Sequence, residues 1–175
     1  KVAARVVSRD SNNWFDVFTI DKGYEDGIKP DMNVIAGDGL VGIVSEVGKH
    51  YSKVRPIIDD KSNVSGMFIK TSDTCIIKGN LESIYDGYID ATMISQDAKI
   101  EDGFEVVTSH ISSKYLQGIL IGYVSDIVED ENTLSKVAKL TPVVNFDKLE
   151  TVLVITQLKD NSDIGDVLSN DQKTN

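Results

Sequence analysis

The chain has 175 residues, a hydrophobic share of 41% and a formal net charge of −10, with a pI near 4.6. This composition is typical of one ordinary globular domain or of two small ones, each with its own core. The acidic balance argues against nucleic-acid binding, which needs a basic face to displace counterions from the phosphate backbone. No apolar run approaches the roughly 20 residues that span a bilayer, and no signal peptide is recognisable.

Two single residues bear on the cellular setting. The chain begins with Lys1 rather than Met, so we expect an anchoring or targeting segment upstream. Cys75 is the only cysteine, and cysteine-based metal sites need several ligands. The cysteine count therefore predicts neither an internal disulfide nor a metal site.

Short β-branched segments bounded by Gly, Asp, Asn and Pro recur along almost the whole chain, which is typical of a β-sandwich or barrel. We predict an all-β fold with six strands in each half and little helix. The first six are Val2–Ser8, Phe15–Asp21, Met32–Ala36, Leu40–Val47, Lys53–Asp59 and Val64–Lys70. The second six are Cys75–Gly79, Gly87–Ile94, Phe104–Ser109, Gly118–Val128, Lys136–Val144 and Glu150–Thr156. The best candidate for a helical turn is Ser112–Leu116.

The two halves share sequence blocks in the same order. IKPDMNVI at Ile28 matches IEDGFEVV at Ile100, GIVSEV at Gly42 matches GYVSDI at Gly122, and SKV occurs in both halves. The second copy has longer loops, chiefly residues 108–117, and surface loops tolerate insertions at low cost. We therefore predict two tandem six-stranded barrels related by duplication, over residues 1–72 and 73–158, followed by a polar, disordered tail over residues 159–175.

The string GDGLVG at residues 37–42 has the spacing of a dinucleotide-binding loop, with Asp59 and Asp60 downstream. That fingerprint requires its glycines to open a helix, and LVGIVSEV is instead rich in β-branched residues that favour strands. We interpret Gly37–Gly39 as a hairpin connection and expect no cofactor. Structural roles are predicted for four glycines: Gly39, Gly42, Gly118 and Gly122. Gly42 and Gly122 lie inside strands, where we expect them to form barrel corners.

Two other kinds of chemistry deserve weighing. A double barrel with His50, then Asp59 and Asp60, then several serines has the residue order of chymotrypsin-like hydrolases, and an extracellular hydrolase is our alternative hypothesis. None of the serines of the second half lies in the glycine-flanked turn that exposes such a nucleophile. These serines are Ser109, Ser112, Ser113 and Ser125.

Binding chemistry has weak support as well. The two histidines, His50 and His110, share no metal-binding motif, and the acidic clusters at residues 23–27 and 128–132 lack the spacing of a calcium loop. A carbohydrate-binding module would need more exposed aromatic residues than Trp14 and its few companions. We therefore predict no catalytic residue, no metal and no cofactor.

The chain resembles the extracytoplasmic region of the MreC family of rod shape-determining proteins from about Val2 to Ile155. The segments that carry this resemblance are ARVVSRD at Ala4 with Trp14 after it, TIDKG at Thr19, Asp26–Gly27, MNVI, GLVGIVSEV, SKVRPIID, VVTS at Val106, YLQGILIGYV at Tyr115 and TPVVNFDKLETVLVI. Two positions differ from the family pattern. His110 stands where the family usually has Gly. The family often has an aromatic residue followed by Pro before Gly118, whereas here Tyr115 is followed by Leu116.

The resemblance implies a fold of two six-stranded barrels and a non-enzymatic scaffold at the outer face of the bacterial plasma membrane. It also implies a single transmembrane helix and a coiled coil upstream, the latter forming a homodimer. The implied partners are MreD and the RodA-type and penicillin-binding synthases of lateral peptidoglycan synthesis, which are linked indirectly to the cytoplasmic MreB filaments.

A strand-rich acidic module suits protein contact, and strand edges or the long loop of the second half offer places for it. We predict a contact loop made of Thr108, Ser109, His110, Tyr115, Leu116 and Gly118.

Overall fold

The computed structural model describes residues 1–9, 16–129, 132 and 134–160. In this part of the chain the sequence forms twelve strands, one short α-helix and two 3-10 turns. The strands are β1 (Val2–Ser8), β2 (Phe18–Ile20), β3 (Asn33–Ala36), β4 (Gly39–Val47), β5 (Ser52–Pro56), β6 (Asn63–Phe68), β7 (Thr74–Lys78), β8 (Ile89–Ser95), β9 (Glu105–Thr108), β10 (Leu120–Glu129), β11 (Ser135–Pro142) and β12 (Thr151–Ile155). The helical segments are η1 (Tyr24–Asp26), α1 (Leu81–Tyr85) and η2 (Phe146–Lys148).

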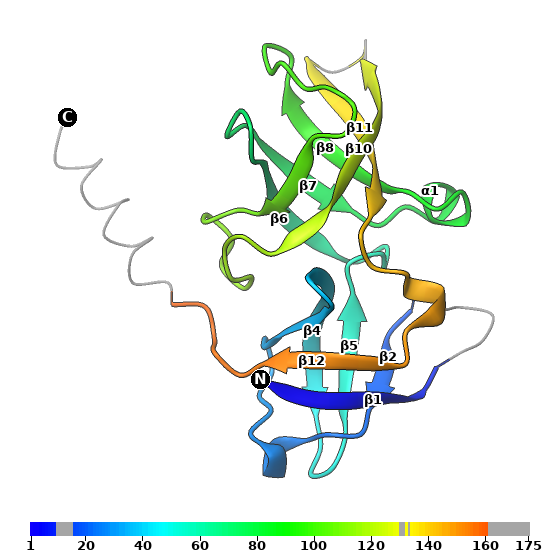
Figure 1. Cartoon of the computed structure of the whole chain (residues 1–175), viewed down its shortest axis with the longest axis vertical. Helices are drawn as coiled ribbons and strands as arrows, with labels where there is room; N and C mark the ends of the chain where they lie inside the picture. Colours follow the sequence, from blue (N-terminus) through cyan, green and yellow to red (C-terminus); the bar gives the residue numbers. More distant parts are fainter. Residues whose placement is uncertain (10–15, 130–131, 133, 161–175) are drawn as a thin grey trace, which may run out of the picture.

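The strands close into two barrels of six strands each, which lie end to end (Figure 1). Barrel 1 has the order β4-β3-β12-β1-β2-β5, and pairing of β5 with β4 closes it. Barrel 2 has the order β10-β9-β6-β7-β8-β11, and pairing of β11 with β10 closes it. The predicted all-β class with six strands in each barrel is confirmed, and closure leaves every strand with a partner on both sides.

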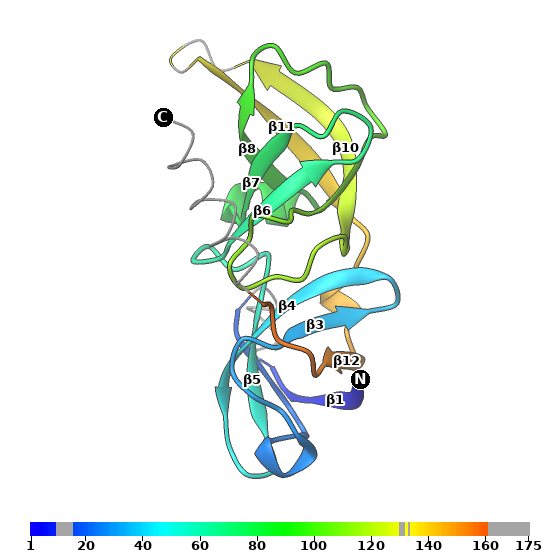
Figure 2. The ribbon, with the colours of Figure 1, turned by 90° about the vertical axis from the view of Figure 1, so that its left-hand side faces the viewer.

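The division of the chain between the barrels differs from the expected one. β6 pairs with β7 and β9 and belongs to barrel 2, so the boundary expected at residue 72 is wrong. β12 lies between β1 and β3, where Val154 faces Val2 and Leu153 faces Ile35. The last strand therefore completes barrel 1 (Figure 2), and barrel 2 is one continuous segment of the chain. Most of the predicted tail lies outside the described residues.

The two barrels have the same strand order when β12 is matched to β6. The repeated blocks then occupy equivalent strands: β3, β4 and β5 in barrel 1, and β9, β10 and β11 in barrel 2. Val34 pairs with Gly42 and Ile35 with Leu40, and in the same way Val106 pairs with Gly122 and Val107 with Leu120. In each barrel, one residue of the second strand (β4 or β10) is skipped between these two pairings. This forms a β-bulge at the same place in both barrels.

The bulges account for Gly42 and Gly122. A bulge bends its strand and increases the local twist, as the corner of a small barrel requires. A Cβ atom added to Gly42 would overlap the carbonyl oxygen of Arg55 on the neighbouring strand β5. A Cβ atom added to Gly122 would overlap the carbonyl oxygen of Thr141 on β11. The predicted corner role of these two glycines is thus supported by both the bend and the close backbone approach.

The opening glycine string forms a hairpin. Ala36 pairs with Gly39, only Gly37 and Asp38 lie between β3 and β4, and Gly37 has a φ of +59°. The following residues form β4 rather than a helix. The hairpin interpretation of Gly37–Gly39 is therefore confirmed.

The apolar side chains of both barrels form one continuous buried cluster. Its centre in barrel 1 includes Ile20 and Leu40, and its centre in barrel 2 includes Phe68 and Ile89. Buried residues of the two segments that connect the barrels, such as Ile58, join the centres. The barrels therefore meet through an apolar junction.

Helix is scarce, and its position was not predicted. Asn80 caps α1 by accepting a hydrogen bond from the backbone N–H of Glu82 at 3.0 Å, a signal that the sequence does carry. The expected helical turn at Ser112–Leu116 is wrong, because that segment is irregular. Within the described ranges, no helix has the length and apolar character needed to cross a bilayer.

Candidate functional site at the barrel junction

The connection between β9 and β10 is much longer than its equivalent in barrel 1. In barrel 1 two residues join the equivalent strands, whereas residues 109–119 join β9 to β10. The N–H of Thr108 donates to the carbonyl of Ile119 at 2.9 Å, so these two residues occupy the places of Ala36 and Gly39. We call residues 109–118 the strap.

Thr108 holds the base of the strap. Its hydroxyl donates to the carbonyl of Leu116 at 2.5 Å and accepts from the N–H of Ile119 at 2.8 Å. The N–H of Gly118 donates to the carbonyl of Thr108 at 3.0 Å, and the φ of Gly118 is +84°, which favours glycine. The Ser109 N–H donates to the Ser65 carbonyl of β6 at 2.9 Å. Both ends of the strap are thus fixed on barrel 2.

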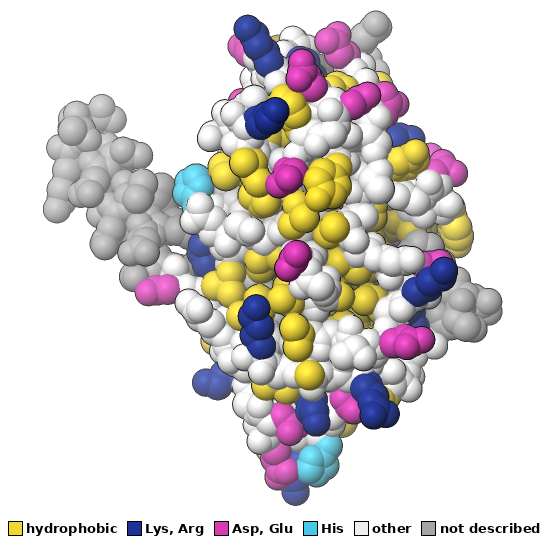
Figure 3. Space-filling view, in the orientation of Figure 1, with side chains coloured by type: hydrophobic (Ala, Val, Ile, Leu, Met, Phe, Trp, Pro, Cys, Tyr) yellow, Lys and Arg dark blue, Asp and Glu magenta, His cyan; other side chains and the backbone are white. Residues whose placement is uncertain are grey.

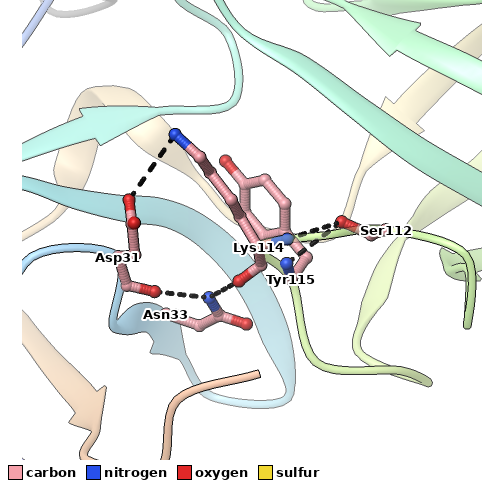
Figure 4. Close-up of polar contacts among 5 residues, drawn as sticks. All are labelled: Asp31, Asn33, Ser112, Lys114 and Tyr115. Carbon is pink, nitrogen blue, oxygen red and sulfur yellow. Dashed lines mark hydrogen bonds and ion pairs between the residues drawn. The ribbon is translucent and has the colours of Figure 1, made fainter. Parts of the chain in front are cut away.

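Asn33, the first residue of β3, holds the middle of the strap on barrel 1 (Figure 4). Its side-chain oxygen accepts from the N–H of Leu116 at 2.8 Å, and its side-chain nitrogen donates to the Lys114 carbonyl at 3.0 Å. The same nitrogen lies 3.3 Å from the carbonyl of Asp31. Asn33 is only 1% exposed, so these bonds satisfy a polar side chain that would otherwise be costly to bury.

Tyr115 fills the space beneath the strap and is 5% exposed. Its N–H donates to the Ser112 hydroxyl at 3.0 Å, which fixes the turn that directs the ring inward. Burial raises the pKa of Tyr115 to about 12, although a hydrogen bond with Ser62 acts in the opposite direction. Lys114 and Asp31 form an exposed ion pair at 3.7 Å, which contributes little to stability.

The outer side of the strap meets the segment that follows β12. The Lys159 ammonium donates to the carbonyl of His110 at 3.1 Å. The His110 side chain faces solvent, and Ile111 beside it is 52% exposed. We call His110 and Ile111 the crest of the strap, an exposed surface that a second molecule could reach.

The structure brings the predicted contact residues together, but most of them point inward. Thr108, Ser109 and Tyr115 are buried, and Leu116 is half-buried. His110 and Gly118 are exposed. No sequence pattern linked Asn33 to the strap. The only signal was a poor strand former as the second residue of the predicted strand Met32–Ala36.

Gly39, the remaining predicted structural glycine, lies where β4 meets the connection between β11 and β12. A Cβ atom at this position would overlap the side chains of Val143 and Val144. Gly39 also pairs with Leu120 of barrel 2 in parallel orientation. Its role is therefore close packing at the junction.

The residues of the hydrolase hypothesis do not come together. His50 lies 3.5 Å from Glu25, and Asp59 lies 3.4 Å from Arg55. The hydroxyls of Ser109 and Ser112 accept bonds from the backbone of the strap, and the hydroxyl of Ser125 contacts that of Thr141. The histidine, one of the two aspartates and three of the four serines of this alternative hypothesis thus each have a different local partner.

In the described ranges, no group of side chains is suited to metal binding, and the one cysteine is buried. Residues 23–27 form η1 with its flanking glycines, whereas residues 128–132 lie partly outside the described ranges, as does Trp14. No group of three or more His, Cys, Asp and Glu residues could hold a metal ion in the part of the chain that the structure describes. Burial raises the pKa of the Cys75 thiol to about 12, so the thiol is protonated at neutral pH and unreactive.

A cleft of about 460 Å³ lies at the junction between α1 and the connection from β11 to β12. Ile84, Tyr85, Tyr88 and Phe146 are among its lining residues. Asp147 also lines it, and the charge of this carboxylate acts on the nearby Arg9. The cleft contains no histidine, cysteine or serine, so it lacks the nucleophile and base of the hydrolase hypothesis.

Comparison with known proteins assigns this double barrel to a family. Residues 6–156 match the family model described as "Rod shape-determining protein MreC, barrel core". The chain belongs to the MreC family. A "Cell shape-determining protein MreC" from Listeria monocytogenes is 34% identical over 160 residues, which cover 87% of this chain and 52% of that protein. The chain thus spans about half the length of this MreC relative.

Solved MreC structures share the fold. MreC of Listeria monocytogenes superposes with a TM-score of 0.80 at 33% identity, covering 90% of this chain and 74% of that one. The major periplasmic domain of MreC, described as a cell shape-determining filament, gives 0.73 at 21% identity and covers 86% and 92%. MreC in a complex with penicillin-binding protein PBP2 from Helicobacter pylori gives 0.66 at 16% identity, covering 86% and 96%.

Proposed function

We propose that this chain is a non-catalytic scaffold for bacterial cell-shape maintenance. The match of residues 6–156 to the MreC barrel core carries the proposal, because it spans both barrels and the strap between them. The name of the Listeria relative supports a role in cell shape. The separated hydrolase residues agree with a role in protein contact rather than in chemistry.

The surface is suited to such contacts. Figure 3 shows hydrophobic side chains gathered across the middle of one face, with acidic and basic side chains more frequent toward its two ends. Several large apolar side chains are exposed in the described ranges, and Ile111 of the strap, at 52%, is one of them. Exposed apolar patches on soluble domains often mark interaction sites.

We propose a penicillin-binding synthase as the direct partner, on the extracytoplasmic side of the membrane. The Helicobacter pylori complex and the periplasmic MreC domain support these two assignments. In the full-length protein, a single transmembrane helix would anchor the module and an upstream coiled coil would form a homodimer. MreD and RodA-type synthases complete the proposed assembly, which connects indirectly to the MreB cytoskeleton.

Binding of this chain to the purified extracytoplasmic part of a penicillin-binding synthase tests the proposal. We place the contact at the crest of the strap, so Ile111→Asp should weaken binding about tenfold or more, as expected for an apolar residue at an interface centre. Met93→Asp on β8 is the matched control, since it adds the same charge at another exposed apolar site. Isothermal titration calorimetry measures both.

Three results would count against parts of this proposal. Equal affinities for Ile111→Asp and the control would exclude the strap as the contact surface while leaving the partner intact. No binding by the unmodified chain would exclude a direct synthase contact through these barrels. Labelling of one serine by an active-site-directed probe would instead favour the hydrolase.

A further inference from the structure

In addition to the two connecting segments and the buried apolar cluster, two attachments join the barrels at opposite ends of β3. We propose that they act as a two-point clamp that fixes the angle between the barrels, and that release of the strap lets barrel 2 pivot about the β3–β4 hairpin. This inference concerns the mechanics of the molecule and does not rest on the proposed function.

The tip of the β3–β4 hairpin is the first attachment. Gly39 pairs with Leu120, and in the described ranges this is the only strand pairing between the barrels. Val143 and Val144 pack against the same glycine, and the N–H of Val143 donates to the Ile121 carbonyl at 3.1 Å. A single pairing with apolar contacts resists separation of the barrels but resists rotation only weakly.

The strap is the second attachment, and it is held at Asn33. Three residue steps separate Asn33 from Ala36 at the hairpin turn, or about 10 Å along an extended strand. Two attachments this far apart oppose rotation about either one. Without the strap, the barrels would remain linked by the hairpin tip and by the two connecting segments, residues 57–62 and 143–150.

The strap is longer than closure of barrel 2 requires. Barrel 1 joins the equivalent strands through Gly37 and Asp38 alone, with the same pairings beside its turn. The additional residues of the strap instead supply Tyr115 and the two backbone groups that bind Asn33. Its length therefore serves the junction between the barrels, not the closure of one barrel.

This equivalence supplies a variant that removes the strap and leaves both barrels closed. Residues 109–118 are replaced by Gly-Asp, which reproduces the connection found between Ala36 and Gly39. A second variant, Asn33→Ala, removes both bonds to the strap. Lys114→Ala is the control, since it removes only the exposed ion pair to Asp31.

Double electron–electron resonance measures the angle between the barrels directly. Nitroxide labels at Lys49→Cys in barrel 1 and Lys99→Cys in barrel 2 use two exposed positions, and Cys75 is too buried to react. We expect one narrow distance distribution for the unmodified chain and for Lys114→Ala. The Gly-Asp replacement and Asn33→Ala should both give a broadened or shifted distribution. In Asn33→Ala, amide exchange at Leu116 should rise about tenfold because its acceptor is lost.

Circular dichroism shows whether the replacement keeps its strand content. A folded replacement with the same narrow distribution as the unmodified chain would overturn the proposal. Should the replacement fail to fold, Asn33→Ala decides the question. An unchanged distribution in that variant would overturn the proposal, whether or not exchange at Leu116 rises.

Discussion

Gly42 and Gly122 show how single residues set the shape of both barrels. Replacing either one with Ala would drive a methyl group into the backbone of the neighbouring strand, at Arg55 or Thr141. We expect each substitution to lower the free energy of unfolding by about 1–3 kcal/mol, the usual cost of overpacking. Urea unfolding measures it, with Ser45→Ala at an exposed position of β4, the strand of Gly42, as a control expected to stay within about 0.5 kcal/mol. Equal stabilities would mean that the strands can separate at these corners.

Cys75 and Tyr115 predict how stability depends on pH. Burial raises the pKa of the Cys75 thiol from 9.0 to about 12 and that of the Tyr115 phenol from 10.0 to about 12. In the folded chain both groups stay mostly neutral until the pH approaches 12, whereas in the unfolded chain Cys75 ionises around pH 9 and Tyr115 around pH 10. The stability that they contribute is complete below pH 9 and is lost as the pH rises toward 12, by up to about 1.4 kcal/mol per pH unit for each group.

Urea unfolding at several pH values measures this loss. Tyr115→Phe keeps the buried ring and removes the ionisable hydroxyl, so the fall in stability above pH 10 should be shallower than in the unmodified chain. Cys75→Ala should likewise make the fall above pH 9 shallower, whatever its effect on stability at pH 7. The same slope in all three proteins would show that these groups do not govern alkaline unfolding.

At the scale of single residues, the sequence allowed some roles to be predicted and concealed others. Gly42 and Gly122 could be identified because glycine inside a strand pattern has few physical explanations. The role of Asn33 could not, because its partners are backbone groups more than 80 residues away in the chain. Backbone groups carry no residue-specific signal, so no motif marks the place where the strap binds.

Among the elements, β12 determines which parts of the chain can fold alone. Residues 62–145 contain all six strands of barrel 2, whereas residues 1–72 lack the strand between β1 and β3. We expect the first fragment to give a β-rich circular dichroism spectrum and a cooperative thermal transition. Residues 1–72 should remain unfolded or aggregate through open strand edges. A folded 1–72 fragment would show that β12 is dispensable.

Each of the twelve predicted strands corresponds to an observed one, with ends that differ by a few residues. Side-chain alternation identifies a strand because it depends only on neighbouring residues. The strand with which it pairs is often a distant segment of the chain. All six strands of barrel 2 lie between β1 and β12 in the sequence, yet β12 pairs with β1. The prediction divided the twelve strands into two consecutive sets of six, which led to the wrong boundary at residue 72.

For the molecule as a whole, the net charge of −10 predicts a dependence on salt. The described ion pairs are few and mostly exposed, so repulsion among carboxylates should exceed their attraction. Raising sodium chloride from about 10 mM to about 300 mM screens this repulsion and should increase the free energy of unfolding by about 1 kcal/mol. Differential scanning fluorimetry follows the shift, and potassium chloride should reproduce it. A decrease would indicate that attractive pairs dominate.

The position of β12 between β1 and β3 also sets an order of events during synthesis. The ribosome releases the last strand of the second barrel before the final strand of the first, with eight residues between β11 and β12, so the second barrel can close first. The five earlier strands of barrel 1 cannot form a closed barrel until β12 is available, because its place between β1 and β3 is empty. The oldest part of the nascent chain is thus the last to reach its finished form, and any factor that protects unpaired strands would act there.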